Sequence, residues 1–190
     1  MTKILMILCL LMSTTLVYAQ EEESSKVTTF EKFLSKTGTF VRLTEYKLPD
    51  VVKGTWKSYA MTADLRKITS DNEDVWFLHI EKERYQRSNA VANIAQSDLE
   101  DLLHAVQVLE QVFANTNGLG DADYIEEKFT TKDDFRFGFY ITKNKKGEIE
   151  TKWFINLDTN LSGATYAFDT PEQIKTLFEN AIEAIATYSK

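Results

Sequence analysis

The sequence predicts an α+β fold in which an antiparallel sheet packs against helices, and in which one helix plus four strands occurs twice. Segments rich in β-branched and aromatic residues come in two groups of four, separated by turn residues. Two longer segments carry apolar residues at helical spacing. A Trp-Phe pair recurs in the third segment of each group, in "DVWFLHI" (74–80) and "TKWFINL" (151–157). The predicted order is therefore α-ββββ-α-ββββ-α.

The first 19 residues have the plan of a signal peptide. Lys3 precedes an apolar run over residues 4–12, and small and polar residues follow. Val17 and Ala19 satisfy the small-residue rule for the peptidase, which predicts cleavage between Ala19 and Gln20. A retained membrane anchor fits less well, because a spanning helix needs roughly 20 apolar residues. We expect an exported chain, periplasmic or secreted, with no membrane span after cleavage.

Cys9 lies inside the apolar run and follows Leu8, which is not the arrangement of a lipid-anchored export signal. Its removal with the signal leaves a chain without cysteine, which excludes disulfides, thiol catalysis and thiolate metal sites. About 170 residues are enough to bury one hydrophobic core without such links. The prediction is a single domain over residues 28–190.

The charge of the chain limits its partners. The whole chain holds 22 basic and 29 acidic residues, and the loss of Lys3 leaves a net charge of about −8. The excess is local, because residues 98–190 hold 9 basic and 17 acidic groups. Nucleic acid and anionic membranes are poor partners for that half. Solubility outside the cytoplasm is the simplest explanation of the acidity.

Residues 20–27 are polar and predict a disordered lead before the domain. The first helix is expected over residues 28–38, because Thr28 and Glu31 have capping-box spacing and Gly38 provides a left-handed terminator. Turn residues then separate four strand-like segments of the first repeat, which extends over about residues 28–96. These segments are Thr39 to Leu48, Thr55 to Ile68, Asp74 to Glu83 and Ala90 to Ala95.

The second repeat, about residues 97–169, follows the same order. Its helix begins at "SDLEDLL", where Ser97 and Glu100 have capping-box spacing. A closing helix over 170–188 is predicted from a Thr170–Gln173 box, with Pro171 at the first helical position. Duplication explains this matched order, whereas a shared catalytic motif would explain only the Trp-Phe pair. The four strand-like segments are 124–130, 135–143, 148–157 and 164–168.

The Trp-Phe strands place aromatic residues on both of their faces. Because side chains alternate along a strand, Trp76 and Trp153 point to one face, while Phe77 and Phe154 point to the other. Either the first helix or the other repeat covers this second face, or an exposed aromatic face remains there with Tyr140 as a neighbour. Phe77, Tyr140 and Phe154 are therefore the candidate binding residues.

Few residues suggest catalysis or a metal site. His79 and His104 are the only histidines and do not have metal-ligand spacing, and the chain lacks a nucleophile elbow and a phosphate-binding glycine loop. Asp121 and Asp123 lie in "NGLGDADY", an oxygen-rich loop of the kind that binds calcium, but Ile125 stands where a third ligand is expected. We predict no cofactor and no catalytic residue.

Four strands and a helix, occurring twice, resemble the arrangement in PUR-type and Whirly single-stranded nucleic-acid binders. The duplication of a helix with strands also resembles TATA-binding-protein-like folds. These resemblances concern the order of elements, without a sequence motif of either family. Fold alone does not carry function, and the expected export and the acidic second half argue against nucleic acid.

The sequence supports three hypotheses for function. The first is an exported, non-enzymatic binding or accessory domain with a protein partner. The second is a periplasmic or secreted carrier of a small apolar ligand, with a pocket between sheet and helices. The third is an exported hydrolase. Space for the carrier's ligand would come from small residues, namely Ala90, Ala92, Ala95, Gly163 and Ala164.

Overall fold

A computed structural model describes residues 27–49, 61–71, 73–84, 87–158 and 163–190. The expected signal peptide, its cleavage site at Ala19 and Gln20, and the lead up to residue 26 lie outside the described residues. The first part of the predicted strand from Thr55 to Ile68 also lies outside them. Within the described ranges, no helix is both long enough and apolar enough to cross a membrane.

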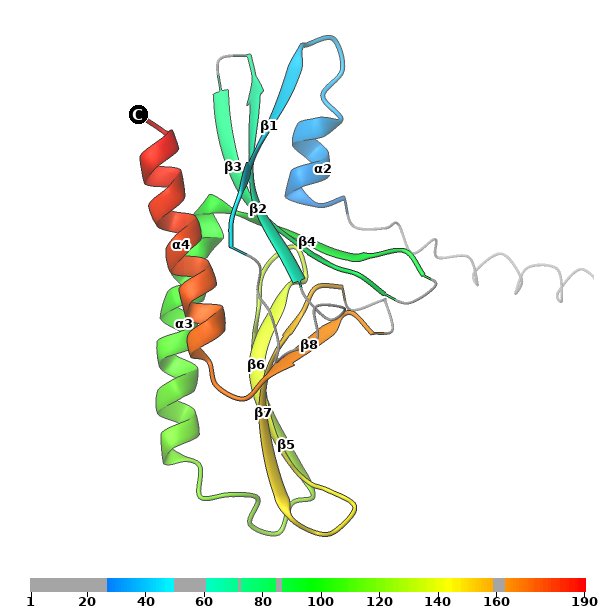
Figure 1. The fold of residues 1–190 in the computed structure, drawn as a ribbon, viewed down its shortest axis with the longest axis vertical. Helices are drawn as coiled ribbons and strands as arrows, with labels where there is room; N and C mark the ends of the chain where they lie inside the picture. The colour runs from blue at the N-terminus through cyan, green and yellow to red at the C-terminus, as the bar shows by residue number, and fades with distance from the viewer. Residues whose placement is uncertain (1–26, 50–60, 72, 85–86, 159–162) are drawn as a thin grey trace, which may run out of the picture.

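The α+β fold and its duplicated strand-rich unit are confirmed (Figure 1). Three helices alternate with two groups of four strands, in the order that the sequence predicts. The first group forms a sheet in the order β1-β2-β3-β4, and the second group forms a separate sheet in the order β5-β6-β7-β8. The elements are α2 (Thr29–Leu34), β1 (Val41–Lys47), β2 (Met61–Ser70), β3 (Glu73–Lys82), β4 (Ala90–Ala95), α3 (Gln96–Asn115), β5 (Tyr124–Thr130), β6 (Arg136–Lys143), β7 (Ile149–Asn156), β8 (Thr165–Phe168) and α4 (Glu172–Tyr188).

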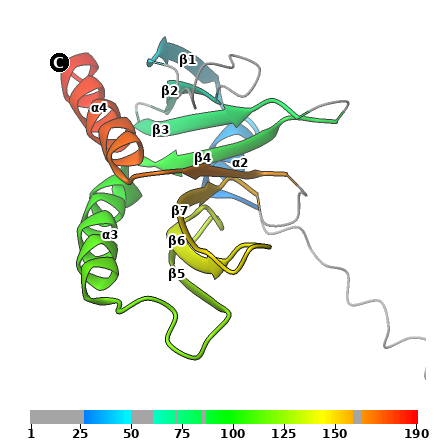
Figure 2. The same cartoon turned by 60° about the horizontal axis from the view of Figure 1, so that its bottom comes forward.

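One hydrophobic core joins both sheets and the two long helices. Figure 2 shows α3 and α4 on the same side of the strands. The C-terminal part of α3 packs on the second sheet, where the Phe113 ring lies 5.2 Å from Phe139. The end of α4 packs on the first sheet, where Tyr188 stacks on Tyr46 at 4.2 Å. Both long helices therefore contribute to a core that the two sheets share.

The two tryptophans of the Trp-Phe pairs are core residues at corresponding positions. Trp76 and Trp153 are each 3% exposed, and both belong to the main hydrophobic cluster. Trp76 contacts Tyr46, with ring centroids 5.5 Å apart, and Trp153 stacks on Phe137 at 5.7 Å. Burial of such large rings is a main stabilising contribution in a domain without disulfides.

The first helix, α2, has the predicted capping box. The Thr28 hydroxyl accepts the backbone N–H of Glu31, and the Glu31 carboxylate accepts the backbone N–H of Thr28 at 2.8 Å. The helix lies on the side of the first sheet away from α3 and α4 (Figure 1). There the rings of Phe30 and Phe33 pack on Phe77, at centroid distances of 5.1 and 6.2 Å. This contact covers the second face of the first Trp-Phe strand.

The predicted caps of the long helices are wrong. Helix α3 follows β4 directly, so that Ala95, the last residue of the strand, is the N-cap and Ser97 already lies inside the helix. Pro171 is the N-cap of α4 and not its first helical residue, and no side chain caps this helix. Thr170 bonds the carboxylate of Glu172 instead. Helix α3 begins directly after β4, so Ser97 comes too late in the chain to cap it.

Candidate functional site

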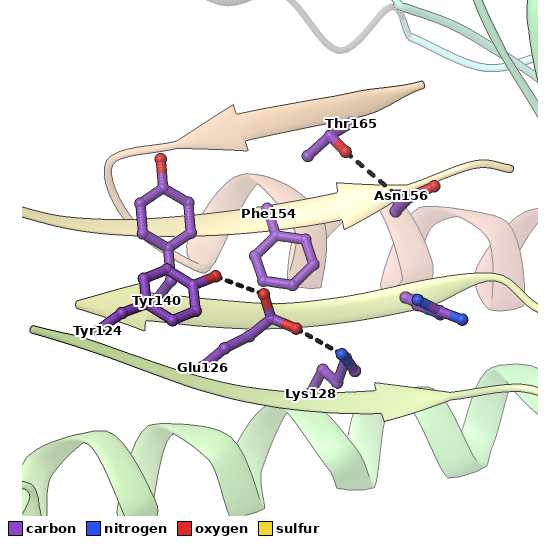
Figure 3. A pocket seen from close by; sticks show the side chains of 8 residues that line it. Tyr124, Glu126, Lys128, Tyr140, Phe154, Asn156 and Thr165 are labelled. Carbon is purple, nitrogen blue, oxygen red and sulfur yellow. Dashed lines mark hydrogen bonds and ion pairs between the residues drawn. The ribbon is translucent and has the colours of Figure 1, made fainter. Parts of the chain in front are cut away.

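The outer face of the second sheet, opposite the core, carries a groove of about 260 Å³ that we call the aromatic groove (Figure 3). Its side chains occupy alternate positions on all four strands, so the pleat places them on one face. The intervening residues, such as Phe139 and Ile155, point into the core. The groove is lined by Tyr124, Glu126, Lys128, Arg136, Tyr140, Phe154, Asn156 and Thr165.

Three aromatic side chains form one end of the groove. Phe154 is only 6% exposed and forms the floor, where Tyr140 covers it at a centroid distance of 6.2 Å. Tyr124 stacks on Tyr140 at 6.0 Å and is 52% exposed. Tyrosine is amphipathic and has few rotatable bonds, so it provides contact area at a low cost in conformational entropy. This end therefore suits an apolar or aromatic group.

An ion pair forms the rim of the aromatic end. The Tyr124 hydroxyl donates to Glu126 Oε2 at 2.5 Å, and Lys128 Nζ donates to Glu126 Oε1 at 2.5 Å (Figure 3). Burial raises the pKa of Tyr124 to about 12, and the hydrogen bond to Glu126 and the charge of Glu126 act in the same direction. The hydrogen bond from Lys128 lowers the pKa of Glu126, with a further contribution from Tyr124. At neutral pH this rim holds a neutral phenol beside a paired carboxylate.

Polar side chains line the other end of the groove. Asn156 donates from Nδ2 to Thr165 Oγ1 at 3.2 Å, and its Oδ1 accepts the backbone N–H of Asp158. Arg136 also lies at this end, opposite Asn156 across the β6–β7 pair. Its Nε is buried, and the described part of the chain offers this N–H no hydrogen-bond acceptor. A buried donor without an acceptor is costly, and Arg66 on the first sheet has a buried Nε in the same state.

Gly138 is a buried residue of β6 that the backbone of β5 approaches closely. It lies between Arg136 and Tyr140 on β6 and pairs with Phe154 on β7. A Cβ atom at this position would lie 2.1 Å from the carbonyl oxygen of Glu127, so a side chain would require the backbone of β5 to shift. Glycine within a strand commonly marks such a close backbone approach.

The structure brings together two of the three predicted binding residues. Tyr140 and Phe154 are neighbours in the groove, whereas Phe77 is fully buried under α2 on the first sheet. The sequence reasoning did not identify the polar residues of the groove or Tyr124. Their alternation along β5, "YIEEKFT", was a usable signal, because Tyr124, Glu126 and Lys128 share one face of that strand.

The other residues considered in the sequence lie apart from the groove. Asp121 and Asp123 are exposed, and Asp123 pairs with Lys143 at 3.3 Å. Among the described residues, no three His, Cys, Asp or Glu side chains gather in a way that could hold a metal ion. His79 is buried beside Asn93, with its Nδ1 2.8 Å from the Asn93 Oδ1, and His104 is exposed on α3.

The small residues considered for a carrier pocket are part of the packing. Ala90, Ala92 and Ala164 are at most 6% exposed and belong to the main hydrophobic cluster. Ala95 packs in the smaller cluster under α2, with Phe30 and Phe77. Gly163 lies in a turn with a φ of +82°, a conformation that favours glycine.

Comparisons with protein-family models, with curated proteins and with solved structures find no match to this chain.

Proposed function

We propose that this protein is an exported, non-enzymatic binding module and that its binding surface is the aromatic groove. The observation that supports the proposal is a difference between the two repeats. On the first sheet, α2 covers the outer aromatic face, but on the second sheet no described helix lies over the corresponding face. On the first sheet, the surface that corresponds to the aromatic groove is covered by a polypeptide segment, α2. We therefore expect the aromatic groove to bind a polypeptide segment as well.

The pairing register defines this correspondence. Phe77 lies opposite Arg66 on β2 and opposite Ala95 on β4. Phe154 lies in the same way opposite Gly138 on β6 and Ala167 on β8. Two residues further along the second strand of each sheet, Ile68 and Tyr140 face the same side. Phe77 and Ile68 of the cluster under α2 thus correspond to Phe154 and Tyr140 at the aromatic end of the groove.

The chemistry of the groove favours recognition over catalysis. Glu126 has a lowered pKa and is bonded on both oxygens, which makes it a weak general base at neutral pH. Tyr124, with a pKa of about 12, is a weak general acid. Tyrosine and arginine are, in contrast, enriched where proteins bind other proteins. The hydrolase alternative gains no support from this site.

The carrier alternative requires open space between sheet and helices. The alanines that suggested such space pack against other apolar side chains in the two hydrophobic clusters. Small residues in this setting allow close approach of neighbouring elements, which accounts for them without a ligand.

Export is the second part of the proposal, and it rests on the sequence of residues 1–19. The exported protein should begin at Gln20, as determined by N-terminal sequencing or intact mass. A protein that retains a lipidated Cys9 would refute both the cleavage site and release from the membrane.

Site-specific photo-crosslinking tests the binding surface. A benzophenone amino acid replaces Tyr124 in the groove or, as a control, Tyr188, which is 46% exposed on α4. In the native host, irradiation should yield a discrete adduct with another polypeptide from position 124 and not from position 188. The adduct should weaken when Arg136 is changed to Gln in the same protein. Equal labelling from both positions, or none from position 124, would contradict the proposal.

A further inference from the structure

We infer that two copies of this chain associate edge to edge through β5, around a two-fold axis that passes beside Glu127, so that their second sheets form one continuous sheet. This interface goes beyond the proposed function, because it uses the edge of the second sheet and not the floor of the aromatic groove. Three features of β5 support it, namely its outward-directed backbone groups, the order of its charges and the order of its apolar residues.

Strand β5 is the edge of the second sheet, and in the described part of the chain it pairs with β6 alone (Figure 3). Just after the strand, Thr131 donates its backbone N–H to the carbonyl of Phe135 at 2.9 Å. Such bonds recur at every second residue of an antiparallel strand, so residues 125, 127 and 129 bond β6. Residues 124, 126, 128 and 130 therefore direct their N–H and C=O groups away from β6. These groups form a template for a further strand.

The charges of β5 complement one another across a two-fold axis at its central residue, Glu127. Antiparallel pairing about this axis places Glu126 opposite Lys128 of the second copy, and Lys128 opposite Glu126 of the second copy. Within one copy, Glu126 and Lys128 already form an ion pair. The dimer would join two such pairs into a ring of four alternating charges. A network of this kind is more favourable than an isolated surface pair.

The apolar residues of β5 complement one another in the same register. Ile125 and Phe129 lie on the core side of the strand, where each is half-buried against the main hydrophobic cluster. The axis at Glu127 places Ile125 opposite Phe129 of the second copy, and Phe129 opposite Ile125. Aromatic and β-branched side chains that face each other across two strands stabilise a sheet. Association would therefore cover the parts of these side chains that a single copy leaves exposed.

The pattern selects one register. The two Glu127 side chains meet at the axis, and like charges in this position weaken the pairing. An axis at Glu126 or Lys128 would also oppose two like charges. It would in addition place Ile125 or Phe129 opposite Glu127, and the complementary pairs would be lost. The register about Glu127 is therefore the most favourable of the three.

The corresponding edge strand of the first sheet, β1, does not complement itself in this way. A two-fold axis at Thr44, its central residue, would place Leu43 opposite Glu45. It would place Arg42 opposite Tyr46 and would pair no opposite charges. Charged residues on an edge strand commonly prevent pairing with another chain. In β5, however, opposite charges lie where a two-fold axis brings them together, so a second copy is the partner that this edge fits.

Light scattering on the mature full-length protein tests the association over a dilution series. We expect the mass of two chains at high concentration and of one chain on dilution. Lys128→Glu and Glu126→Lys should each be monomeric over the same range, because each variant places only like charges opposite one another. An equimolar mixture of the two variants should form a dimer again, because every Glu at these positions then faces a Lys. Recovery in the mixture also shows that both variants are folded.

Disulfide formation locates the axis. Residues 127 of the two copies form a non-hydrogen-bonded pair with Cα atoms about 4.5 Å apart, a separation that a disulfide can bridge. Glu127→Cys should therefore form a linked dimer when a thiol oxidant such as diamide is added. Glu45→Cys, at an exposed position of β1, is the control and should remain unlinked. The expected mature chain contains no other cysteine.

The outcomes decide the inference without reference to the groove. A parent protein that remains monomeric at every concentration would overturn it and would leave the β5 edge to another partner. A dimer that survives both charge variants, or that Glu127→Cys does not link, would place the interface elsewhere and would also overturn it. In the photo-crosslinking test of the proposed function, mass separates the two ideas. An adduct of two copies of this chain reports β5 pairing, whereas an adduct with a different polypeptide reports the groove.

Discussion

Phe77 and Phe154 hold the same register position in the two sheets, but Phe77 lies under a helix and Phe154 forms the floor of a groove. Phe77 is fully buried by the rings of α2, whereas Phe154 is covered by a tyrosine of its own sheet. Equivalent side chains thus have different neighbours because α2, the helix of the first repeat, lies on the outer face of its sheet, whereas α3 packs on the core side of the second sheet. This asymmetry gives the molecule one outer face covered by α2 and one outer face that carries a groove.

Removing either tryptophan of the Trp-Phe pairs should strongly destabilise the fold. Trp76→Ala and Trp153→Ala each remove a ring that is 97% buried, which typically costs about 3–5 kcal/mol in free energy of unfolding. Urea denaturation measures this free energy. Phe40→Ala is the control, because Phe40 is 98% exposed and its loss should change stability by less than about 0.5 kcal/mol. Tryptophan variants as stable as Phe40→Ala would show that these residues are not part of the core.

The contact between Phe30 and Phe77 should be measurable as a coupling energy. The edge-to-face pair predicts that the double mutant Phe30→Ala/Phe77→Ala loses less stability than the sum of the single mutants. The expected difference is about 0.5–1.5 kcal/mol, as is typical of aromatic pairs. Denaturation of the parent and the three variants provides the cycle. Strict additivity would mean that α2 does not pack on this strand in solution.

Thr28 and Ser97 both have capping-box spacing in the sequence, but only Thr28 caps a helix. Thr28→Ala should cost about 1 kcal/mol, because it leaves the backbone N–H of Glu31 without its acceptor. Ser97→Ala should cost less than about 0.5 kcal/mol, because Ser97 lies inside α3 and does not cap it. Thermal melting of both variants tests the pair. A larger loss at Ser97 would contradict the observed start of α3.

The hydrogen bond between Tyr124 and Glu126 should appear in the ionisation of the phenol. The pKa of Tyr124 is about 12 in the folded protein, above the ordinary value near 10, so the unfolded chain loses this proton first as pH rises. Its contribution to stability is therefore fully present below about pH 10 and decreases as pH rises towards 12. Glu126→Gln removes the negative charge and should lower the pKa of Tyr124. Carbon NMR of the tyrosine ring over this pH range measures the shift, and an unchanged pKa would contradict the contact.

The sequence by itself determined the strand segments of this protein, its first helix and the strand face on which each side chain lies. Alternation of side chains placed Trp76 and Trp153 on one face and Phe77 and Phe154 on the other, because the pleat has a period of two. The strands Ala90–Ala95 and Tyr124–Thr130 begin and end where turn residues and β-branched residues predicted. The capping box at Thr28 was also readable, since it involves residues three positions apart.

The tertiary structure alone decided what covers each face. The division of the strands into two sheets, the packing of α3 on the second sheet and of α4 on the first, and the position of α2 over Phe77 all depend on contacts between residues distant in sequence. A sequence pattern shows that a face must be buried, but it does not show which element buries it. For the same reason Arg136, Tyr140 and Phe154 form one groove only when β6 and β7 pair in this register.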